Sequence, residues 1–359
     1  MSKVFTDIDF ALFLPACFLV GIGGLILMSV SPESFPRQFL YIGFALAAFL
    51  LFSKLDFKVL LAFAPWLYVV SLSLLLITLV IGNLTRGATR WIEIGSFTLQ
   101  ASEIAKPLLL VFLAWFLAKS GNFRRFPFAA AFVFTAGLFI LRQPDLGSAL
   151  VILAGFAGAA IVAGIPFSFL TASIVLFGGA SPFLWNFLAD YQRARILSFI
   201  SPMTDPLGSG YNAIQAMIAV GSGEVFGRGL GQGTQSQLAF LPERHTDFIF
   251  AALSEELGLL GALAVILAFL LLLWRIIGLL RLAKEDFEKV FLGGAFATVF
   301  FQAAVNIGMN LGLLPITGIP LPFVSSGGSS LLAMSVILGI CSSIGQGLSK
   351  RASLGIIRS

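Results

Sequence analysis

The chain alternates between long apolar runs and short polar connections. Most of the runs approach the ~20 consecutive apolar residues that a helix needs to cross a bilayer. The ten runs cover residues 10–30, 37–53, 59–81, 101–119, 126–141, 147–164, 166–187, 247–273, 290–313 and 327–347. The runs at 37–53 and 126–141 are short, so their helices would be tilted, extended or partly re-entrant. The pattern predicts an all-α polytopic membrane protein, with residues 1–359 forming a single transmembrane domain of about ten helices.

The longest connection, residues 188–246, lies between the seventh and eighth runs. Its apolar residues recur at helical spacing in two places, which predicts two short amphipathic helices on the outer membrane surface. These residues are Ile196, Leu197, Phe199 and Ile200, and then Tyr211, Ile214 and Ile218. Glycines are frequent from Gly208 to Gly233, so backbone amides there could approach a ligand closely. A flexible linker is the alternative interpretation.

Composition strengthens the membrane assignment. Hydrophobic residues make up 58% of the chain and charged residues only 11%, whereas soluble domains carry about 25% charged residues. The net charge of +5 calls for no nucleic-acid partner, because an excess of Lys and Arg is expected in cytoplasmic connections. Two cysteines are too few for a disulfide framework. The first apolar run is too long for a cleavable signal.

The distribution of basic residues predicts the orientation. With the N-terminus in the cytoplasm, most of the 22 Lys and Arg residues flank the cytoplasmic ends of the runs, as the positive-inside rule requires. Both termini are then cytoplasmic. Most of the remaining basic residues lie outside, in segments 82–100 and 188–246, where this rule does not explain them. We therefore expect the chemistry of the protein on its outer face.

The strongest candidate for such chemistry is PERHTDFIF, residues 242–250, at the mouth of the eighth run. Asp247 lies at the expected first turn of this helix, beside two phenylalanines. Desolvation there would raise its proton affinity, and a carboxylate suits general-base work. A helix cap by Thr246 or Asp247 is the structural alternative, but it leaves Arg244 and His245 unexplained. We expect Arg244 and His245 to contribute to substrate binding.

Two further acids, Glu255 and Glu256, follow in the same run. At roughly 1.5 Å per residue they lie about 12–14 Å deeper than Asp247. Ionisable residues at that depth are costly and often functional. At roughly 100° per residue, the two cannot both face one cavity together with Asp247. We expect a structural role, in which at least one of them pairs with a basic residue on another span.

A second ionisable group lies near the outer mouth of the fourth run and contains Arg86, Arg90, Glu103 and Lys106. Glu103 and Lys106 are three residues apart on one helix face, so an ion pair is one interpretation. The other is that the three cations bind phosphate. Because the cations are separate, a diphosphate is a better match than a single carboxylate.

Two more outer junctions are polar. Asp145 could cap the sixth run or pair with Arg142. Prolines and glycines from Pro315 to Ser330 predict a fixed, non-helical loop, which is tolerated at membrane depth only where protein or a polar cavity shields it. A stiff connector is the alternative. His245 is the only histidine, which excludes the usual histidine-rich zinc site, and the chain has no P-loop for ATP.

Five of these stretches resemble the SEDS family (shape, elongation, division and sporulation), the RodA/FtsW group. They are Gly87–Ile92, Ser102-Glu103 with Lys106, Gln143–Ala149, His245–Ala251 with Glu255–Gly258, and Pro315–Ser325. Each stretch alone is weak evidence for the family. All five, in the family's order over nearly the whole chain, are highly specific for it. Ala101 stands where the family often has proline, and Ser326 where it often has tyrosine. The short termini are more like those of the elongation members.

The resemblance implies a peptidoglycan glycosyltransferase that polymerises lipid II into glycan strands for cell-wall elongation. It implies a location in the bacterial cytoplasmic membrane and a class B penicillin-binding protein, a transpeptidase, as partner. Asp247 would be the catalytic carboxylate, with Arg90, Glu103 and Lys106 among the functionally important positions. Undecaprenyl diphosphate would be the leaving group. The sequence requires no cofactor, although Mg²⁺ or Mn²⁺ could assist.

Two other functions are open from the sequence. A lipid II flippase would use Glu255, Glu256 and Lys106 as a polar path, but such a path must reach the inner face. The charged motifs instead cluster outside, and the inner connections are short. A non-enzymatic scaffold for a penicillin-binding protein would leave the buried charges unexplained.

Overall fold

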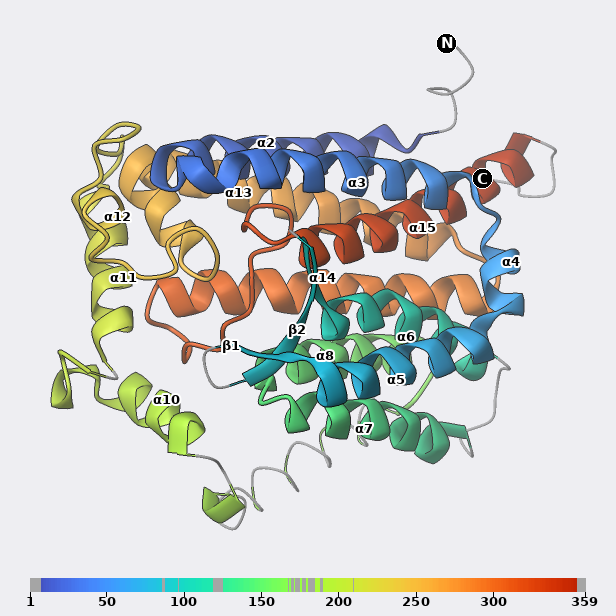
Figure 1. The fold of residues 1–359 in the computed structure, drawn as a ribbon. Helices are drawn as coiled ribbons and strands as arrows, with labels where there is room; N and C mark the ends of the chain where they lie inside the picture. The colour runs from blue at the N-terminus through green and yellow to red at the C-terminus, as the bar shows by residue number, and fades with distance from the viewer. Residues whose placement is uncertain are drawn as a thin grey trace.

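The computed structural model describes residues 8–353, except 86, 87, 96, 119–124, 167, 169, 170, 172–174, 176–178, 180–184, 188, 189 and 209. Its helices run back and forth between the two ends of one bundle (Figure 1). The first helix begins and the last helix finishes at one end, which we call the terminal end. The opposite end, the loop end, carries α10 (Asp190–Ile200), α11 (Tyr211–Ser222) and α12 (Thr234–Gln237).

Six helices of the described residues are long and apolar enough to cross a membrane. They are α2 (Phe10–Val30), α3 (Phe35–Lys54, after the 3-10 turn η1, Pro32–Ser34), α5 (Ala64–Ile81), α13 (Ile249–Leu282), α14 (Asp286–Asn310) and α15 (Gly328–Ser353). Three apolar helices have 17 residues each: α6 (Ala101–Leu117), α7 (Phe126–Arg142) and α8 (Leu146–Val162). Two 3-10 turns, η3 (Trp185–Phe187) and η4 (Pro202–Thr204), flank α10.

The helical, polytopic prediction is confirmed. Every expected run except the seventh corresponds to a helix, and more than half of the seventh, 166–187, lies outside the described residues. The short run at 37–53 gains length because α3 begins at Phe35 and follows η1 directly. The run at 59–81 is divided between α4 (Phe57–Ala62) and α5.

Capping residues and prolines explain where several helices begin. The side chains of Asp9, Asp56 and Asp145 accept a backbone N–H at the starts of α2, α4 and α8. Each bond satisfies a donor that has no partner within its helix. Proline is the second residue of α3, α5 and α7, where its missing N–H costs nothing.

A small antiparallel sheet lies between α5 and α6 and is an addition to the predicted helices. It consists of β1 (Asn83–Thr85), β2 (Ala88–Ile94) and β3 (Phe97–Gln100), in the order β1-β2-β3. Trp91 lies opposite Gln100 in the register of β2 and β3. Gly95, with a φ of +63°, forms part of the turn between them. β2 is short and includes the polar residues Thr89, Arg90 and Glu93, so a search for long apolar runs overlooks it.

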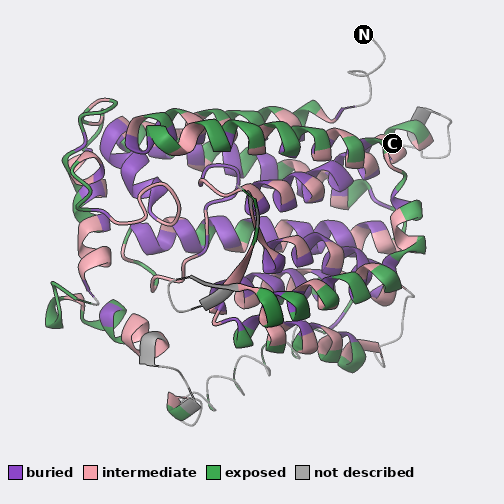
Figure 2. Cartoon of the chain, in the orientation of Figure 1, coloured by how far each residue is buried: buried purple, intermediate pink, exposed green. Residues whose placement is uncertain are grey.

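The core of the bundle lies around α6, α8, α14 and α15, whereas the outward faces of α2, α3, α5 and α7 are exposed (Figure 2). The helices α8 and α14 pack closely, because Gly158 faces the backbone of Gly293 with no room for a side chain. Small residues commonly bring transmembrane helices this near. Large hydrophobic side chains such as Leu14, Trp66 and Phe134 point outward, which suits a lipid environment.

Candidate functional site

Asp247 belongs to a non-helical segment at the loop end, residues 238–248, which we call the site loop. It precedes α13 rather than lying in its first turn, and the N-cap position is Phe248, which makes no side-chain cap. The alternative of a cap by Thr246 or Asp247 is therefore wrong. The Asp247 carbonyl accepts hydrogen bonds from Asn306 Nδ2 at 3.0 Å and Asn310 Nδ2 at 3.1 Å, so two side chains of α14 fix its backbone.

The segment between α14 and α15, residues 311–327, runs beside the site loop, and we call it the proline loop. The hydroxyl of Ser325 donates to the carbonyl of Thr246 at 2.7 Å, and the amide of Ser326 donates to the carbonyl of His245 at 2.9 Å. Non-helical backbone at the end of an apolar bundle needs such partners. The two loops therefore support each other at the residues that flank Asp247.

Arg195 on α10 reaches the same place. Its Nη1 atom donates to the carbonyl of Thr317 at 3.0 Å. A Cβ atom built on the next residue, Gly318, would lie 3.5 Å from Asp247 Oδ2 and 3.9 Å from Arg195 Nη1. The carboxylate and the guanidinium therefore adjoin one point beside Gly318. Both side chains are half-buried, so this point is accessible from outside the bundle.

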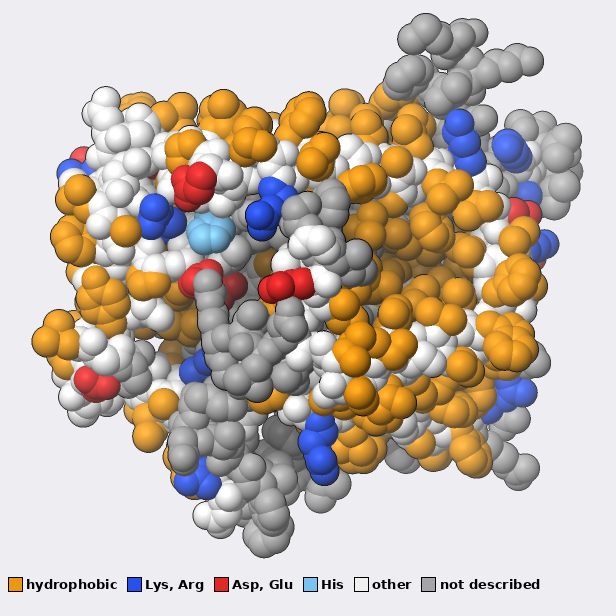
Figure 3. Space-filling model, in the orientation of Figure 1, with side chains coloured by type: hydrophobic (Ala, Val, Ile, Leu, Met, Phe, Trp, Pro, Cys, Tyr) orange, Lys and Arg blue, Asp and Glu red, His pale blue; other side chains and the backbone are white. Residues whose placement is uncertain are grey.

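Further charges surround this point. Acidic and basic side chains gather around the histidine near the loop end, on a face that is otherwise largely hydrophobic (Figure 3). Arg244 Nε donates to the carbonyl of Val30 at the end of α2, at 3.0 Å. Asp247, Arg244 and His245 thus lie on one loop, and Arg195 joins Asp247 from α10.

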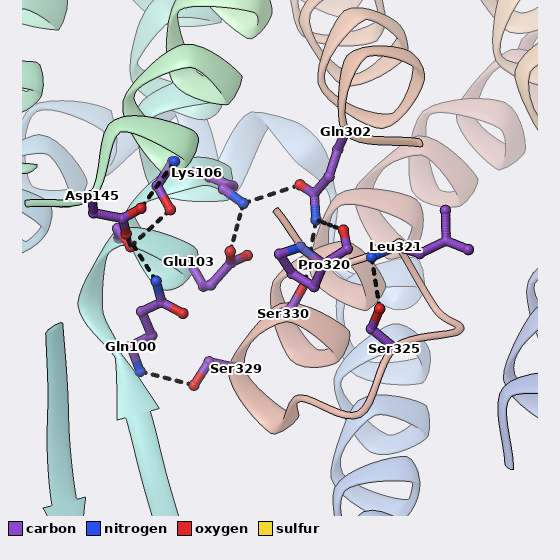
Figure 4. Close-up of polar contacts among 12 residues, drawn as sticks. Gln100, Glu103, Lys106, Asp145, Gln302, Pro320, Leu321, Ser325, Ser329 and Ser330 are labelled. Carbon is purple, nitrogen blue, oxygen red and sulfur yellow. Dashed lines mark hydrogen bonds and ion pairs between the residues drawn. The ribbon is translucent and has the colours of Figure 1, made fainter. Parts of the chain in front are cut away.

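Glu103 and Lys106 of the second predicted group lie deeper, between α6 and α14 (Figure 4). Lys106 Nζ lies 2.7 Å from Glu103 Oε1 and 3.0 Å from Gln302 Oε1. The side chains of Lys106 and Glu103 are only 2% and 1% exposed. Gln302 in turn donates to the carbonyl of Pro320 in the proline loop, at 3.0 Å. The ammonium is thus bound to protein groups, as the ion-pair interpretation expects, and it links α6 to the proline loop.

Removing one partner of this pair is expected to lower the free energy of unfolding by about 3–5 kcal/mol, because an unpaired charge would remain buried. Lys106→Met leaves the Glu103 carboxylate alone, whereas the double variant Glu103→Gln, Lys106→Met removes both charges and should recover much of the loss. Thermal unfolding of the purified variants in detergent measures the difference. A Lys106→Met protein as stable as the double variant would contradict the prediction.

Arg90 and Asp145 organise the neighbouring junction between α7 and α8. Arg90 Nε donates to the carbonyl of Gln143 at 3.1 Å, and its Nη2 donates to the carbonyl of Pro144. Asp145 caps α8 and accepts from Gln100 Nε2 and Ser102 Oγ, both at 2.9 Å. Capping, rather than pairing with Arg142, is thus the arrangement seen for Asp145. Arg86 lies outside the described residues.

The two acids of α13 have neutral donors in the described part of the chain. Glu255 accepts the amides of Gln235 and Ser236, and Glu256 accepts from Ser29 Oγ at 2.7 Å. The expectation of a basic partner on another span is wrong there. Both oxygens of Glu255 accept amides of the outer segment, whereas Glu256 Oε2 is buried without a hydrogen-bond partner in the described residues. Sequence spacing could not show either arrangement.

An apolar groove of about 490 Å³ opens between α2 and α3. Phe13 and Phe49 line the groove toward the terminal end, and Met28 and Phe35 line it near the loop end. Phe323 of the proline loop also contributes to its wall. A single apolar chain could therefore lie beside the bundle and end near the polar residues of the site.

Sequence reasoning missed Arg195. The positive-inside rule did not explain the basic residues of segment 188–246, and Arg195 is one of them. That signal could not separate Arg195 from Arg193, whose guanidinium instead donates to the carbonyls of Trp185 and Asn186. In the described residues, no group of three or more His, Cys, Asp and Glu side chains could hold a metal ion.

Comparisons with known proteins agree over nearly the whole chain. A family model described as cell cycle protein, FtsW/RodA/SpoVE, matches residues 18–350. The chain is 37% identical to peptidoglycan glycosyltransferase MrdB of Escherichia coli (strain K12), over 96% of this chain and 94% of the relative. It is 39% identical to stage V sporulation protein E of Bacillus subtilis (strain 168), over 85% and 84% of the two chains.

Solved structures give the same result. A chain in a peptidoglycan synthase complex, described as coordinating polymerization and crosslinking, superposes with a TM-score of 0.82 and 31% identity, over 95% of this chain and 98% of that one. Rod shape determining protein RodA of Thermus thermophilus gives a TM-score of 0.72 and 28% identity, over 95% and 98%. Because sequence and fold match over almost the full length, this chain belongs to the FtsW/RodA/SpoVE family of cell cycle proteins.

Proposed function

We propose that this chain is a peptidoglycan glycosyltransferase that polymerises lipid II into glycan strands for cell-wall elongation. The observation that carries the proposal is the position of Asp247 at the loop end, beside the guanidinium of Arg195 and the glycine at 318. A carboxylate and a cation at one accessible point suit a reaction that moves a proton and releases an anion.

In the proposed reaction, Asp247 accepts the proton of the 4-hydroxyl group of an acceptor N-acetylglucosamine. The oxygen attacks the anomeric carbon of the donor N-acetylmuramic acid and forms the new glycosidic bond. The bond from that carbon to the diphosphate oxygen breaks, and undecaprenyl diphosphate leaves with the electron pair. Negative charge that develops on the diphosphate needs nearby cations.

The structure changes which cation is best placed for this role. The sequence alone favours Arg90 and Lys106, but Lys106 is buried in an ion pair and Arg90 donates to two backbone carbonyls. Arg195 adjoins Asp247 and is half-buried. We therefore assign the diphosphate to Arg195, with Arg244 and His245 contributing to binding of the substrate. Arg90, Glu103 and Lys106 then act by holding the surrounding loops.

The apolar groove supports a lipid-linked substrate. The polyprenyl tail would lie between α2 and α3, with its polar head at the loop end near the proline loop. Membrane lipids would fill the same groove in the absence of substrate. This placement explains why transfer between sugars is carried out on a membrane scaffold.

The alternative, a flippase for lipid II, finds less support. The relative from E. coli is named as a peptidoglycan glycosyltransferase. Between the loop end and the terminal end, the facing sides of α6, α8 and α14 are mostly apolar. The Glu103–Lys106 pair is enclosed there rather than part of an open path.

The orientation and the partner follow from the same proposal. The positive-inside rule places the terminal end of the bundle, and thus both termini, in the cytoplasm of the bacterial inner membrane. The loop end with Asp247 then faces outward, where glycan strands are built. Similarity to a synthase complex that combines polymerization and crosslinking supports a class B penicillin-binding protein, a transpeptidase, as partner.

The test is a polymerisation assay. Purified protein, together with its transpeptidase partner, is incubated with lipid II, and the products are separated as glycan strands. We expect strands of increasing length, formed without any added nucleotide. Parallel reactions with EDTA, Mg²⁺ or Mn²⁺ determine whether a divalent cation assists. Translocation of lipid II across vesicles without polymer would instead favour the flippase.

A further inference from the structure

The helix α13 is interrupted below the site. Gly258 adopts φ +67° and ψ −165°, which no helical residue has. Such a break leaves backbone carbonyls and amides without partners in their own helix, and buried groups of this kind must be satisfied elsewhere.

The partners come from residues 223–237, which we call the strap. On one side of the break, the amides of Leu259 and Leu260 donate to the carbonyls of Glu224 and Val225, at 2.9 and 3.2 Å. On the other side, the amides of Arg228 and Gly229 donate to the carbonyls of Glu255 and Glu256, at 2.9 and 3.0 Å. The strap therefore replaces the missing helical bonds.

Glycines permit this close contact. Any side chain on Gly227 would collide with the backbone of Glu256, and any side chain on Gly223 with that of Ser254. Gly227 also has a φ of +81°, which a residue with a side chain rarely adopts. The glycine-rich stretch is thus a docked segment rather than a flexible linker.

The side chain of Glu255 then fastens the far end of the strap. Its Oε1 accepts the amide of Gln235 at 2.8 Å, and its Oε2 accepts the amide of Ser236 at 2.9 Å. The side chain is fully buried. Because each oxygen accepts a backbone amide, both oxygens hold α12 against α13.

The fastening acts on the site loop because α12 leads directly into it. The amide of Leu241 donates to the carbonyl of Gln235 at 3.1 Å. Leu241 itself packs in a small buried cluster with Phe248 and Ala251. One end of the site loop thus depends on Glu255 through α12, and its other end continues into α13, where Glu255 lies.

We infer that Glu255 is a positioning residue, which clamps the strap to α13 and so holds the site loop with Asp247 in its reactive place. The inference rests on the proposed function for the role of Asp247. The contacts between Glu255 and the strap can be tested without measuring catalysis. A displacement of about 1 Å at a reacting group can cost about 100-fold in rate.

The test replaces Glu255 with glutamine, in the full chain bound to its transpeptidase partner. Glutamine has nearly the same size as glutamate. Its side-chain NH₂ group would face the backbone N–H of Gln235 or Ser236, so that buried backbone donor would lose its acceptor. The matched control is Glu224→Gln, because Glu224 is in the strap and its side chain is exposed.

Two measurements are made on each variant: amide hydrogen exchange, and the rate of lipid II polymerisation. In Glu255→Gln we expect faster exchange at residues 235–236 and also in the site loop, at Thr246 and Phe248. We expect kcat to fall by about 10- to 100-fold with KM changed less than about twofold. Glu224→Gln should match the wild type in both measurements.

Two results for Glu255→Gln would overturn the inference. One is faster exchange in α12 while exchange in the site loop stays unchanged. The other is an unchanged kcat for polymerisation. If the wild-type protein makes no polymer, the proposed function fails, but the exchange of the site loop still decides whether the clamp exists. Should Glu255→Gln not fold, Gly233→Ala perturbs the same contact, because its Cβ would lie 2.7 Å from Glu255 Oε2. The same exchange and rate changes are expected for it, and their absence overturns the inference.

Discussion

Asp247→Asn is expected to abolish glycan polymerisation, with a loss of about 10²–10⁴-fold in kcat, the usual contribution of a general base. Asparagine keeps the size of the side chain but cannot accept the proton of the attacking hydroxyl. The backbone carbonyl of residue 247 would still accept from Asn306 and Asn310, so the fold should persist. Quantified glycan strands from lipid II at saturating substrate measure the effect.

A matched control is Asp205→Asn, an exposed carboxylate in the same outer segment, which should leave polymerisation unchanged. Thermal unfolding should give the same transition for Asp247→Asn and the wild type. Undiminished strands in the Asp247→Asn protein would remove Asp247 from the mechanism. Loss of activity together with a lower unfolding temperature would point to a structural role instead.

Arg195→Gln is the second change with a large expected effect, a loss of about 10²–10³-fold in kcat. The variant removes the cation that adjoins Asp247 beside Gly318, and with it the group assigned to the departing diphosphate.

The comparison that isolates this effect is Arg193→Gln. Arg193 lies on the same helix, and its guanidinium donates to the carbonyls of Trp185 and Asn186. Arg193→Gln should leave the polymerisation rate close to that of the wild type. Arg195→Lys keeps the charge and should restore part of the rate but not all of it, because lysine lacks the planar fork of arginine. A rate for Arg195→Gln as high as that for Arg193→Gln would argue against the assignment.

The candidate site was only partly predictable. Asp247, Arg244 and His245 are contiguous in the chain, so their gathering needs no tertiary information. Arg195 comes from another helix, and only the turn at Thr317 and Gly318 brings it to Asp247. The ion pair of Glu103 and Lys106 was open to two interpretations because the sequence gives spacing but not burial.

The sequence by itself determined the membrane class and most of the helices, and it predicted the end at which the chemistry lies. Those properties follow from the length of apolar runs and the distribution of charge, which act locally along the chain. Only the tertiary structure decided the sheet of β1, β2 and β3, the neutral partners of Glu255 and Glu256, and the break at Gly258. Each of these depends on hydrogen bonds between segments far apart in the chain, because a buried polar group must find a partner wherever the fold supplies one.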